Sequence, residues 1–150
     1  MKIYIDADGS PVKDEVIKLA KRYHLEVIMV TAFEHYTNKI YPDFVTFIYV
    51  DKGKDAVDFK IISLIEPNDI LVTQDYGLAS LLINKANVIN QSGMVYTQDN
   101  IDQLLWQRHI GQQMRKQGLR TKSISKYSDE NRQSFSQSLQ RLIEDHLPSD

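Results

Sequence analysis

The stretch MKIYIDADGSP, residues 1–11, decides the fold class of this chain. It begins as a short apolar β-strand, and two carboxylates, Asp6 and Asp8, follow two residues apart. Side chains with this spacing on an extended backbone lean to the same side. Open α/β sheets bind their ligands at the carboxyl ends of their strands. The stretch therefore predicts an α/β protein with an acidic site at the end of its first strand.

The rest of the chain alternates between apolar runs and helical patterns. Runs rich in β-branched and aromatic residues are typical of strands, and apolar residues at helical spacing lie between them. This alternation favours a three-layer α/β fold, with a mainly parallel central sheet of about five strands and helices on both faces. The predicted strands span residues 1–5, 25–30, 44–50, 70–73 and 87–90, with a further short one at 94–96, and the predicted helices span 11–23, 55–65, 76–84, 97–116 and 129–146.

The longest predicted helix spans residues 97–116. Thr97 is expected to cap it. The residues expected to face inward are Ile101, Leu104 and Leu105, with Ile110 and Met114 as further candidates. Trp106 lies at helical spacing with these residues, which is more typical of a core position than of a stacking surface.

A basic segment separates this helix from the last one. Residues 117–128 are polar and basic without periodicity, which predicts a flexible segment. Gly118 is a typical helix terminator, and the final helix over 129–146 is expected to begin near Ser128. One core suffices for a chain of 150 residues, so residues 1–150 are predicted to form a single domain.

Composition narrows the classes of protein to consider. The chain is 42% hydrophobic and 25% charged, as in globular proteins, and contains no cysteine. Disulfides, thiolate zinc sites and cysteine nucleophiles are therefore excluded. No apolar run approaches the roughly 18 residues of a membrane span, and the early acids are unlike a signal peptide. We expect a cytoplasmic protein that does not contact a membrane.

Charge is distributed unevenly along the chain. The net charge is −2, but residues 1–102 carry 15 acidic and 10 basic residues, whereas residues 103–150 carry 5 acidic and 8 basic ones. An acidic reaction centre beside a basic arm suits a polyanionic substrate, although a stretch this short is equally compatible with a solvated face. The arm's candidate substrate-binding residues are Arg115, Lys116, Arg120, Lys122 and Lys126.

Asp6 and Asp8 are the strongest candidates for chemistry. Aspartate is also favoured in turns after strands and at helix starts, so a turn role is the alternative interpretation of each. Turn chemistry would explain one of them, but two aspartates and the polar Ser10 exceed what a turn requires. We therefore assign both aspartates to a predicted catalytic centre.

Three further aspartates follow later strands. Asp75 comes just after the strand ending at Thr73, where aspartate is also a common helix N-cap. Asp55 and Asp58 lie one helical turn apart, where acids also interact favourably with the helix dipole. Parallel strands bring their carboxyl ends to one edge of the sheet. We expect Asp75 and at least one of Asp55 and Asp58, with Asp58 favoured, to join Asp6 in one cleft.

Such a cluster of acids predicts a bound cation. Like charges near ~4 Å repel by about 1 kcal/mol in water, and a hard divalent ion relieves the repulsion. Oxygen ligands without cysteine indicate Mg²⁺ or Mn²⁺ rather than zinc. The four histidines have no metal-ligand spacing and are interpreted as surface or packed residues: His24, His35, His109 and His146.

These motifs together resemble the bacterial YaiI/YqxD family, which is usually described as uncharacterised. The resemblance runs almost from end to end. The family commonly has cysteine where this chain has Ser10, so a thiol role is excluded here. The resemblance rests on Asp6-Ala7-Asp8 with Pro11-Val12-Lys13, Gly53 with Asp55 and Asp58, Thr73-Gln74-Asp75 with Leu78-Ala79, Asn90, Gly93, and the closing helix with Arg132 and Phe135.

That family's fold is similar to the PIN domain, a three-layer nuclease fold with acids around Mg²⁺ or Mn²⁺. Carried over, the resemblance implies that Asp6, Asp58 and Asp75 are the PIN-type metal acids, with Asp8 and Asp55 as auxiliaries. The step from family to nuclease is an analogy between folds.

The leading functional hypothesis is a metal-dependent phosphodiester hydrolase, a nuclease that acts on RNA, with single-stranded RNA as the expected partner. Asp6, Asp8, Asp58 and Asp75 are its predicted catalytic residues, and Asp6, Asp55, Asp58 and Asp75 its predicted Mg²⁺ or Mn²⁺ ligands. Ser10, Lys13 and Thr73 are further substrate-binding candidates.

Two alternatives stay open. The run Ile5-Asp6-Ala7-Asp8-Gly9-Ser10 also resembles the opening of haloacid-dehalogenase-type phosphatases. In that scheme Asp6 is a covalent nucleophile and Asp8 its acid/base. The other alternative is a non-catalytic module that binds RNA or a protein partner and keeps the acid cluster.

Overall fold

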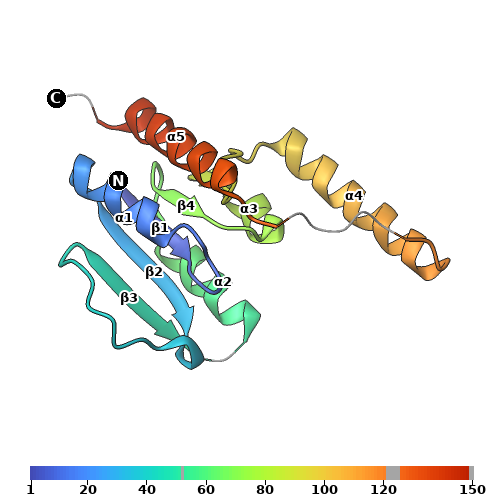
Figure 1. Cartoon of the computed structure of the whole chain (residues 1–150), viewed down its shortest axis with the longest axis horizontal. Coiled ribbons are helices and arrows are strands. Elements are labelled where there is room, and N and C mark those ends of the chain that lie inside the picture. The colour runs from blue at the N-terminus through green and yellow to red at the C-terminus, as the bar shows by residue number, and fades with distance from the viewer. Residues whose placement is uncertain (52, 121–125, 149–150) are drawn as a thin grey trace.

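The computed structural model describes residues 1–51, 53–120 and 126–148. Five parallel strands form one sheet in the spatial order β3-β2-β1-β4-β5. Helices cover both faces of this sheet (Figure 1). The predicted fold class, a three-layer α/β arrangement around a parallel sheet of five strands, is therefore confirmed.

Each predicted element except the strand at 94–96 has a counterpart, with ends that differ by at most two residues. The strands are β1 (Lys2–Asp6), β2 (Glu26–Ala32), β3 (Val45–Val50), β4 (Ile70–Val72) and β5 (Asn87–Ile89). The helices are α1 (Lys13–Tyr23), α2 (Lys54–Leu64), α3 (Tyr76–Leu82), α4 (Gln98–Lys116) and α5 (Asp129–His146), with a 3-10 helix, η1, at Phe33–His35.

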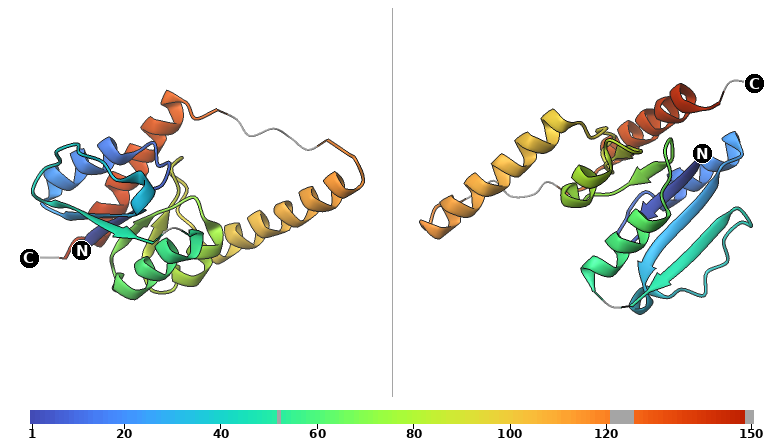
Figure 2. Two further views of the ribbon diagram at one scale, coloured as in Figure 1. Left: turned by 90° about the horizontal axis from the view of Figure 1, so that it is seen from below. Right: turned by 180° about the vertical axis from the view of Figure 1, so that it is seen from behind.

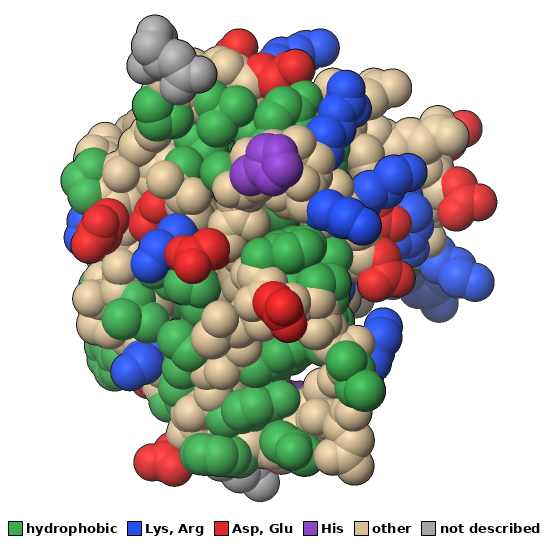
Figure 3. All heavy atoms as spheres, turned by 90° about the vertical axis from the view of Figure 1, so that its left-hand side faces the viewer, with side chains coloured by type: hydrophobic (Ala, Val, Ile, Leu, Met, Phe, Trp, Pro, Cys, Tyr) green, Lys and Arg blue, Asp and Glu red, His purple; other side chains and the backbone are tan. Residues whose placement is uncertain are grey.

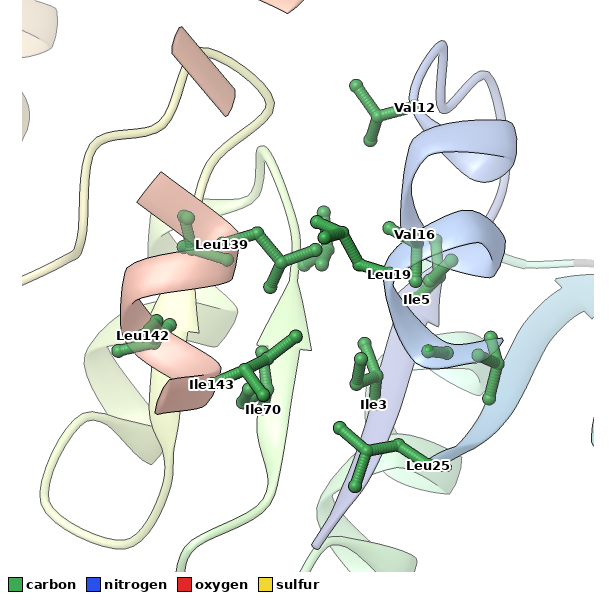
Figure 4. Close-up of a cluster of buried hydrophobic side chains, with 14 of the residues drawn as sticks. Ile3, Ile5, Val12, Val16, Leu19, Leu25, Ile70, Leu139, Leu142 and Ile143 are labelled. Atoms are coloured by element: carbon green, nitrogen blue, oxygen red, sulfur yellow. The ribbon is translucent and has the colours of Figure 1, made fainter. Parts of the chain in front are cut away.

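Helices α1 and α5 cover one face of the sheet. Ile3 of β1 and Ile70 of β4 are fully buried on this face, where Val16 of α1 and Leu139 and Ile143 of α5 pack against them (Figure 4). Each aliphatic side chain buried in this way stabilises the fold by about 1.5–3 kcal/mol. The last helix of the chain is thus part of the main core.

An arginine fixes α5 against the start of α1. The Nη1 of Arg132 donates to the backbone oxygen of Pro11 at 2.7 Å and to Oε1 of Glu15 at 2.8 Å. The guanidinium also lies over the ring of Tyr127, 5.2 Å from its centroid. These contacts hold the end of the loop that follows β1.

The opposite face of the sheet is covered by α2, α3 and the first turns of α4. Tyr4 and Leu71 point to this side and are buried with Ile61, Leu78 and Ile101 from the three helices. Because side chains alternate along a strand, Asp6 points to the same face as Tyr4. The acidic end of β1 therefore opens between the sheet and this second helical layer.

Helix α4 leaves the body of the protein after its first turns. Ile101 is fully buried, but Leu105 is 42% and Trp106 64% exposed. Figure 2 shows the helix extending away from the sheet. Leu104 packs on the core as predicted. The predictions that Leu105 and Ile110 face inward and that Trp106 lies in the core are wrong, because α4 packs on α3 near its start and projects beyond it (Figure 2). No helix in the described residues is long and apolar enough to span a membrane.

Two local predictions also differ from the structure. Helix α1 begins at Lys13 rather than Pro11, because the backbone of Ser10 donates to the oxygen of Ala7 and closes a turn first. The strand expected at 94–96 is only an isolated antiparallel bridge between Val95 and Ile89. Asn90 closes a tight turn there by accepting hydrogen bonds from the backbones of residues 92 and 94 at 2.9 Å.

The edge strand β3 carries a row of aromatic rings. Phe47 and Tyr49 of β3 contact Phe33, Tyr36 and Tyr41 of the preceding connection, with ring centroids 4.8–5.9 Å apart. Figure 3 views the molecule from the left-hand side of Figure 1 and shows hydrophobic side chains in patches between charged ones. The connection between β2 and β3 thus packs on the edge of the sheet by its aromatic residues.

Candidate active site

The candidate site lies where the order of strands changes direction. The chain passes from β1 through β2 to β3 on one side and then places β4 and β5 on the other side of β1. Open α/β sheets form ligand crevices at such switch points, outside the carboxyl ends of the strands. Asp6 ends β1, and Thr73 follows β4 directly beside it.

Asp6 is held by a buried hydroxyl. The Oγ1 of Thr73, which is 2% exposed, donates to Oδ2 of Asp6 at 2.9 Å. Burial raises the pKa of Asp6 to about 6, the Thr73 hydrogen bond opposes this shift, and the negative charges of Asp58, Asp8 and Asp75 add to it. The ionisation of Asp6 is therefore costly in the absence of a cation.

Asp8 lies two residues beyond Asp6 and contacts the end of β2. Its Oδ1 accepts hydrogen bonds from Oγ1 of Thr31 and, at 3.4 Å, from the backbone of Ala32. The side chain is 34% exposed. Asp8 thus joins the loop after β1 to the adjacent strand while it faces the same opening as Asp6.

Asp75 is the N-cap of helix α3, which is the structural role that the sequence offered as an alternative to a catalytic one. Its Oδ1 accepts from the backbone of Leu78 at 3.1 Å, and its own backbone donates to Oγ1 of Thr73 at 3.0 Å. The Thr73 hydroxyl therefore links Asp75 to Asp6. The cap does not remove Asp75 from the site, because its side chain also lines the cleft described below.

The two aspartates of α2 have different surroundings. Asp58 is half-buried and lines the cleft, whereas Asp55, one turn earlier, is exposed. Among the described residues Asp55 does not belong to the lining of the cleft. The geometry thus separates two residues that the sequence offered as a pair, and it favours Asp58.

Asp6, Asp8, Asp58 and Asp75 line one cleft of about 710 Å³. They come from the ends of β1 and β4 and from the first turns of α2, so three separate parts of the chain supply them. We call this opening the acid cleft. Its other described lining residues are Ala32, Glu34, Gly53, Val57, Gln74, Tyr76 and Arg108.

Sequence reasoning missed several of these residues. Arg108 comes from α4, far from the acids in sequence, and nothing in the pattern distinguished it from its basic neighbours. Glu34 lies in η1, between the strands predicted at 25–30 and 44–50, where no helix or strand was predicted. His35, interpreted as a surface or packed residue, is exposed beside the acid cleft, with Nε2 3.9 Å from Oδ1 of Asp8 and 3.8 Å from Oε1 of Glu34. The position of η1 directly after β2 was the signal available for both.

The predicted substrate-binding residues near β1 are divided. Ser10 and Thr73 line a small pocket of about 60 Å³ beside Asp6 and Asp8. Lys13 is half-buried at the start of α1. It is not among the described residues that line this pocket or the acid cleft.

The predicted basic residues of the arm are also divided. Arg115 and Arg120 line a groove of about 640 Å³ on α4. Lys116 and Lys126 are exposed. Lys122 lies outside the described residues, as do residues 121–125 of the segment 117–128 that was predicted to be flexible.

The donor chemistry of the acid cleft suits a hard divalent cation, since its ionisable groups are mainly carboxylates. The arrangement of these carboxylates is not that of a complete metal site. In the described parts of the chain, no three histidine or acidic side chains lie close enough together to hold a metal ion. One oxygen of Asp6, of Asp8 and of Asp75 is already fixed by a protein hydrogen bond.

Comparison with protein families decides the classification. Residues 4–145 match the family described as "Uncharacterized BCR, YaiI/YqxD family". The chain belongs to the YaiI/YqxD family. The resemblance noted from its motifs is therefore confirmed over nearly the full length.

Similar proteins extend over nearly their whole lengths. A protein named "UPF0178 protein" from Enterococcus faecalis is 50% identical over 148 residues, which cover 98% of this chain and 100% of the relative. One of the same name from Ruminiclostridium cellulolyticum is 46% identical, with 95% and 92% covered. A third, from Staphylococcus saprophyticus, is 43% identical, with 95% and 93% covered. No solved structure was found to match this one.

Proposed function

We propose that this YaiI/YqxD-family protein is a metal-dependent phosphodiester hydrolase that acts on RNA. The observation that carries the proposal is the convergence of Asp6, Asp8, Asp58 and Asp75 in one cleft at the switch point of a parallel sheet. A structural role explains the cap at Asp75, but it does not explain why four aspartates from three segments share one opening. The resemblance to PIN-type nucleases agrees with this interpretation and is a supporting analogy.

Asp6, Asp58 and Asp75 would hold Mg²⁺ or Mn²⁺, with Asp8 beside them. The ion would stabilise the negative charge that develops on the attacked phosphate. Asp55 is left out of this set because it is exposed outside the cleft. Burial and three neighbouring carboxylates raise the pKa of Asp6, and a cation beside it would favour the ionised form.

The chain's own residues prepare the cleft for an anionic substrate. Thr73 fixes one oxygen of Asp6, and Thr31 fixes one oxygen of Asp8, so both carboxylates keep their direction. Arg108 brings a positive charge to the lining, where it can donate two hydrogen bonds to a phosphate. Such preorganised charges act most strongly where the site excludes water.

The test is hydrolysis of an end-labelled single-stranded RNA with Mn²⁺, in a matched pair of variants. Asp58→Asn and Asp55→Asn change the same residue type on the same helix, inside and outside the cleft. We expect Asp58→Asn and Asp6→Asn to lower the rate by about 100-fold or more, while Asp55→Asn keeps nearly full activity. Equal losses in both α2 variants, or no hydrolysis by the parent protein, would contradict the proposal.

A parallel assay for a phosphorylated intermediate distinguishes the phosphatase alternative. If Asp6 were a covalent nucleophile, a phosphorylated protein would accumulate in a burst and would be lost in Asp6→Asn. A phosphorylated intermediate with a phosphomonoester substrate, together with intact RNA, would transfer the assignment to that class.

A further inference from the structure

A second groove adjoins the acid cleft. It has a volume of about 640 Å³ and runs along α4 from α3 toward the end of the long helix. We call it the α4 groove. Tyr76 and Arg108 line both openings, so the two lie side by side. A flexible polymer with one unit in the acid cleft would therefore find its next units beside α4.

The charge of the α4 groove is opposite to that of the acid cleft. Arg108, Arg115 and Arg120 line it, and the sequence has no acidic residue between Asp102 and Asp129. In the described residues, none of these three guanidinium groups has a carboxylate within ion-pair distance. Three unneutralised arginines along one groove favour a ligand with repeated negative charges.

The groove also has flat apolar surfaces. Trp106 lines it and is 64% exposed, with its ring 6.0 Å from that of His109. Ile110 is 38% exposed in the same groove. Aromatic faces beside arginines are the combination that binds single-stranded nucleic acids, because each unpaired base stacks on a ring while the phosphates meet the positive charges.

We propose that the α4 groove binds the part of a single-stranded RNA that flanks the bond held in the acid cleft. Arg108 contacts the phosphate at the junction, Arg115 and Arg120 contact the following phosphates, and Trp106 stacks on a base. This inference rests on the proposed function for the identity of the substrate. It adds a strand-binding surface and a residue, Trp106, that has no part in the chemistry.

A second copy of the chain is a poorer occupant of the same surface. A symmetric dimer places the same patch of each subunit against itself. Three arginines would then face three arginines with no intervening acid on α4, and this repulsion opposes closure. The charge of the groove therefore favours nucleic acid over self-association.

The test measures binding without hydrolysis. A fluorescently labelled single-stranded RNA is titrated with the full chain in EDTA, and its anisotropy is followed at several salt concentrations. We expect Trp106→Ala to raise the dissociation constant about fivefold or more, the usual effect of losing one stacked base. Arg115→Ala and Arg120→Ala should each flatten the log–log salt dependence by about 0.7. Arg141→Ala, on the exposed side of α5, is the matched control and should change neither quantity.

Three results would overturn the inference. The first is an unchanged affinity and salt slope in the double variant Arg115→Ala/Arg120→Ala. The second is equal binding of duplex and single-stranded RNA with no effect of Trp106→Ala. The third is sedimentation that shows a dimer of the parent chain and a monomer of Trp106→Ala, because α4 would then be an interface between copies.

The two proposals fail in different ways. If the parent protein binds RNA through the α4 groove but does not hydrolyse it with Mn²⁺, the proposed function fails and the groove assignment stands. If the protein hydrolyses RNA while the groove variants keep the parent dissociation constant, the groove assignment fails and the proposed function stands.

Discussion

Asp6 combines three features that seldom occur together in a purely structural turn residue. It is largely buried, it accepts a hydrogen bond from a buried threonine, and three other aspartates raise its pKa further. The sequence indicated Asp6 because two acids followed one strand. It did not indicate Thr73 as the partner, because the contact depends on the neighbouring position of β4, which is 67 residues away.

The charge of Asp6 should lower the stability of the metal-free protein at neutral pH. Its pKa is raised from 3.8 in the unfolded chain to about 6 in the folded one. The folded state therefore binds the proton more tightly, and stability falls as the pH rises from about 4 to about 6. In EDTA at pH 7, Asp6→Asn should unfold at higher urea, with a gain of up to about 3 kcal/mol, and the gain should vanish near pH 4.

Asparagine at this position can still accept the hydrogen bond from Thr73, so the variant isolates the charge. Asp55→Asn, at an exposed position outside the acid cleft, is the control and should show no comparable gain. A large loss of stability in Asp6→Asn at pH 7 would mean that the ionised carboxylate is itself a structural requirement of the turn.

The Thr73 hydroxyl should control the ionisation of Asp6. Thr73→Val keeps the shape of the side chain but removes the donor to Asp6 and the acceptor for the backbone of Asp75. Because that hydrogen bond stabilises the charged form, the pKa of Asp6 should rise above about 6, as followed by NMR titration of the carboxyl carbon. Stability should fall by about 1–3 kcal/mol, since a donor is left unpaired.

Thr73→Ser retains the hydroxyl and is the matched control for this measurement. Its Asp6 should titrate close to the parent value. A parent-like titration in Thr73→Val would show that burial and the neighbouring carboxylates alone determine the ionisation.

At the scale of elements, local sequence signals were sufficient where one strand or helix meets one face of the core. The period of apolar residues placed α5 correctly, and Ser128 caps it as predicted, with its side chain accepting from the backbone of Asn131. The same reasoning held for α4 as far as Leu104, which packs on the core, and failed beyond it, because a helical period cannot tell a core face from an exposed apolar face. Trp106 is the clearest case.

Gly93 lies in the turn after β5, at a point where α5 leaves no room for a side chain. Its φ is +95°, and a Cβ there would lie 2.7 Å from the backbone oxygen of Ser134 and 2.8 Å from Oγ of Ser138. The turn after β5 thus approaches α5 too closely for any other residue. Gly93→Ala should lose about 3 kcal/mol in urea unfolding, from backbone strain together with overpacking.

Gly118→Ala separates these two causes. Gly118 also has a positive φ, +77°, but nothing lies within 4 Å of its Cβ position. This variant should lose only about 1 kcal/mol, the cost of the backbone conformation. Equal losses at both glycines would mean that the contact with α5 relaxes without cost.

At the scale of the whole molecule, the uneven distribution of charge along the sequence becomes a spatial arrangement. Five of the described acids of the first half gather at the carboxyl end of the sheet, and Arg108 of α4 lines the same cleft; the five are Asp6, Asp8, Glu34, Asp58 and Asp75. The sequence predicted the aspartates because each follows a strand. It could not predict Arg108 as their neighbour, since no strand end marks that position and tertiary packing alone brings it there.

The last prediction concerns the whole chain and its response to a metal. In the absence of metal, Asp6→Asn and Asp75→Asn should be as stable as the parent or more stable, because neighbouring carboxylates repel. With metal the order should reverse. Mn²⁺ at about 100 times its dissociation constant stabilises a protein that binds it only when folded by about 2.7 kcal/mol. The parent should gain this amount in melting curves with and without Mn²⁺, Asp55→Asn should gain nearly as much because it lies outside the acid cleft, and the two cleft variants should gain far less.

The asparagine at position 75 can still cap α3, so a lost response there reports the carboxylate and not the helix. If Asp6→Asn and the parent shift equally with Mn²⁺, the four aspartates do not form a cation site, and the hydrolase proposal loses its main support.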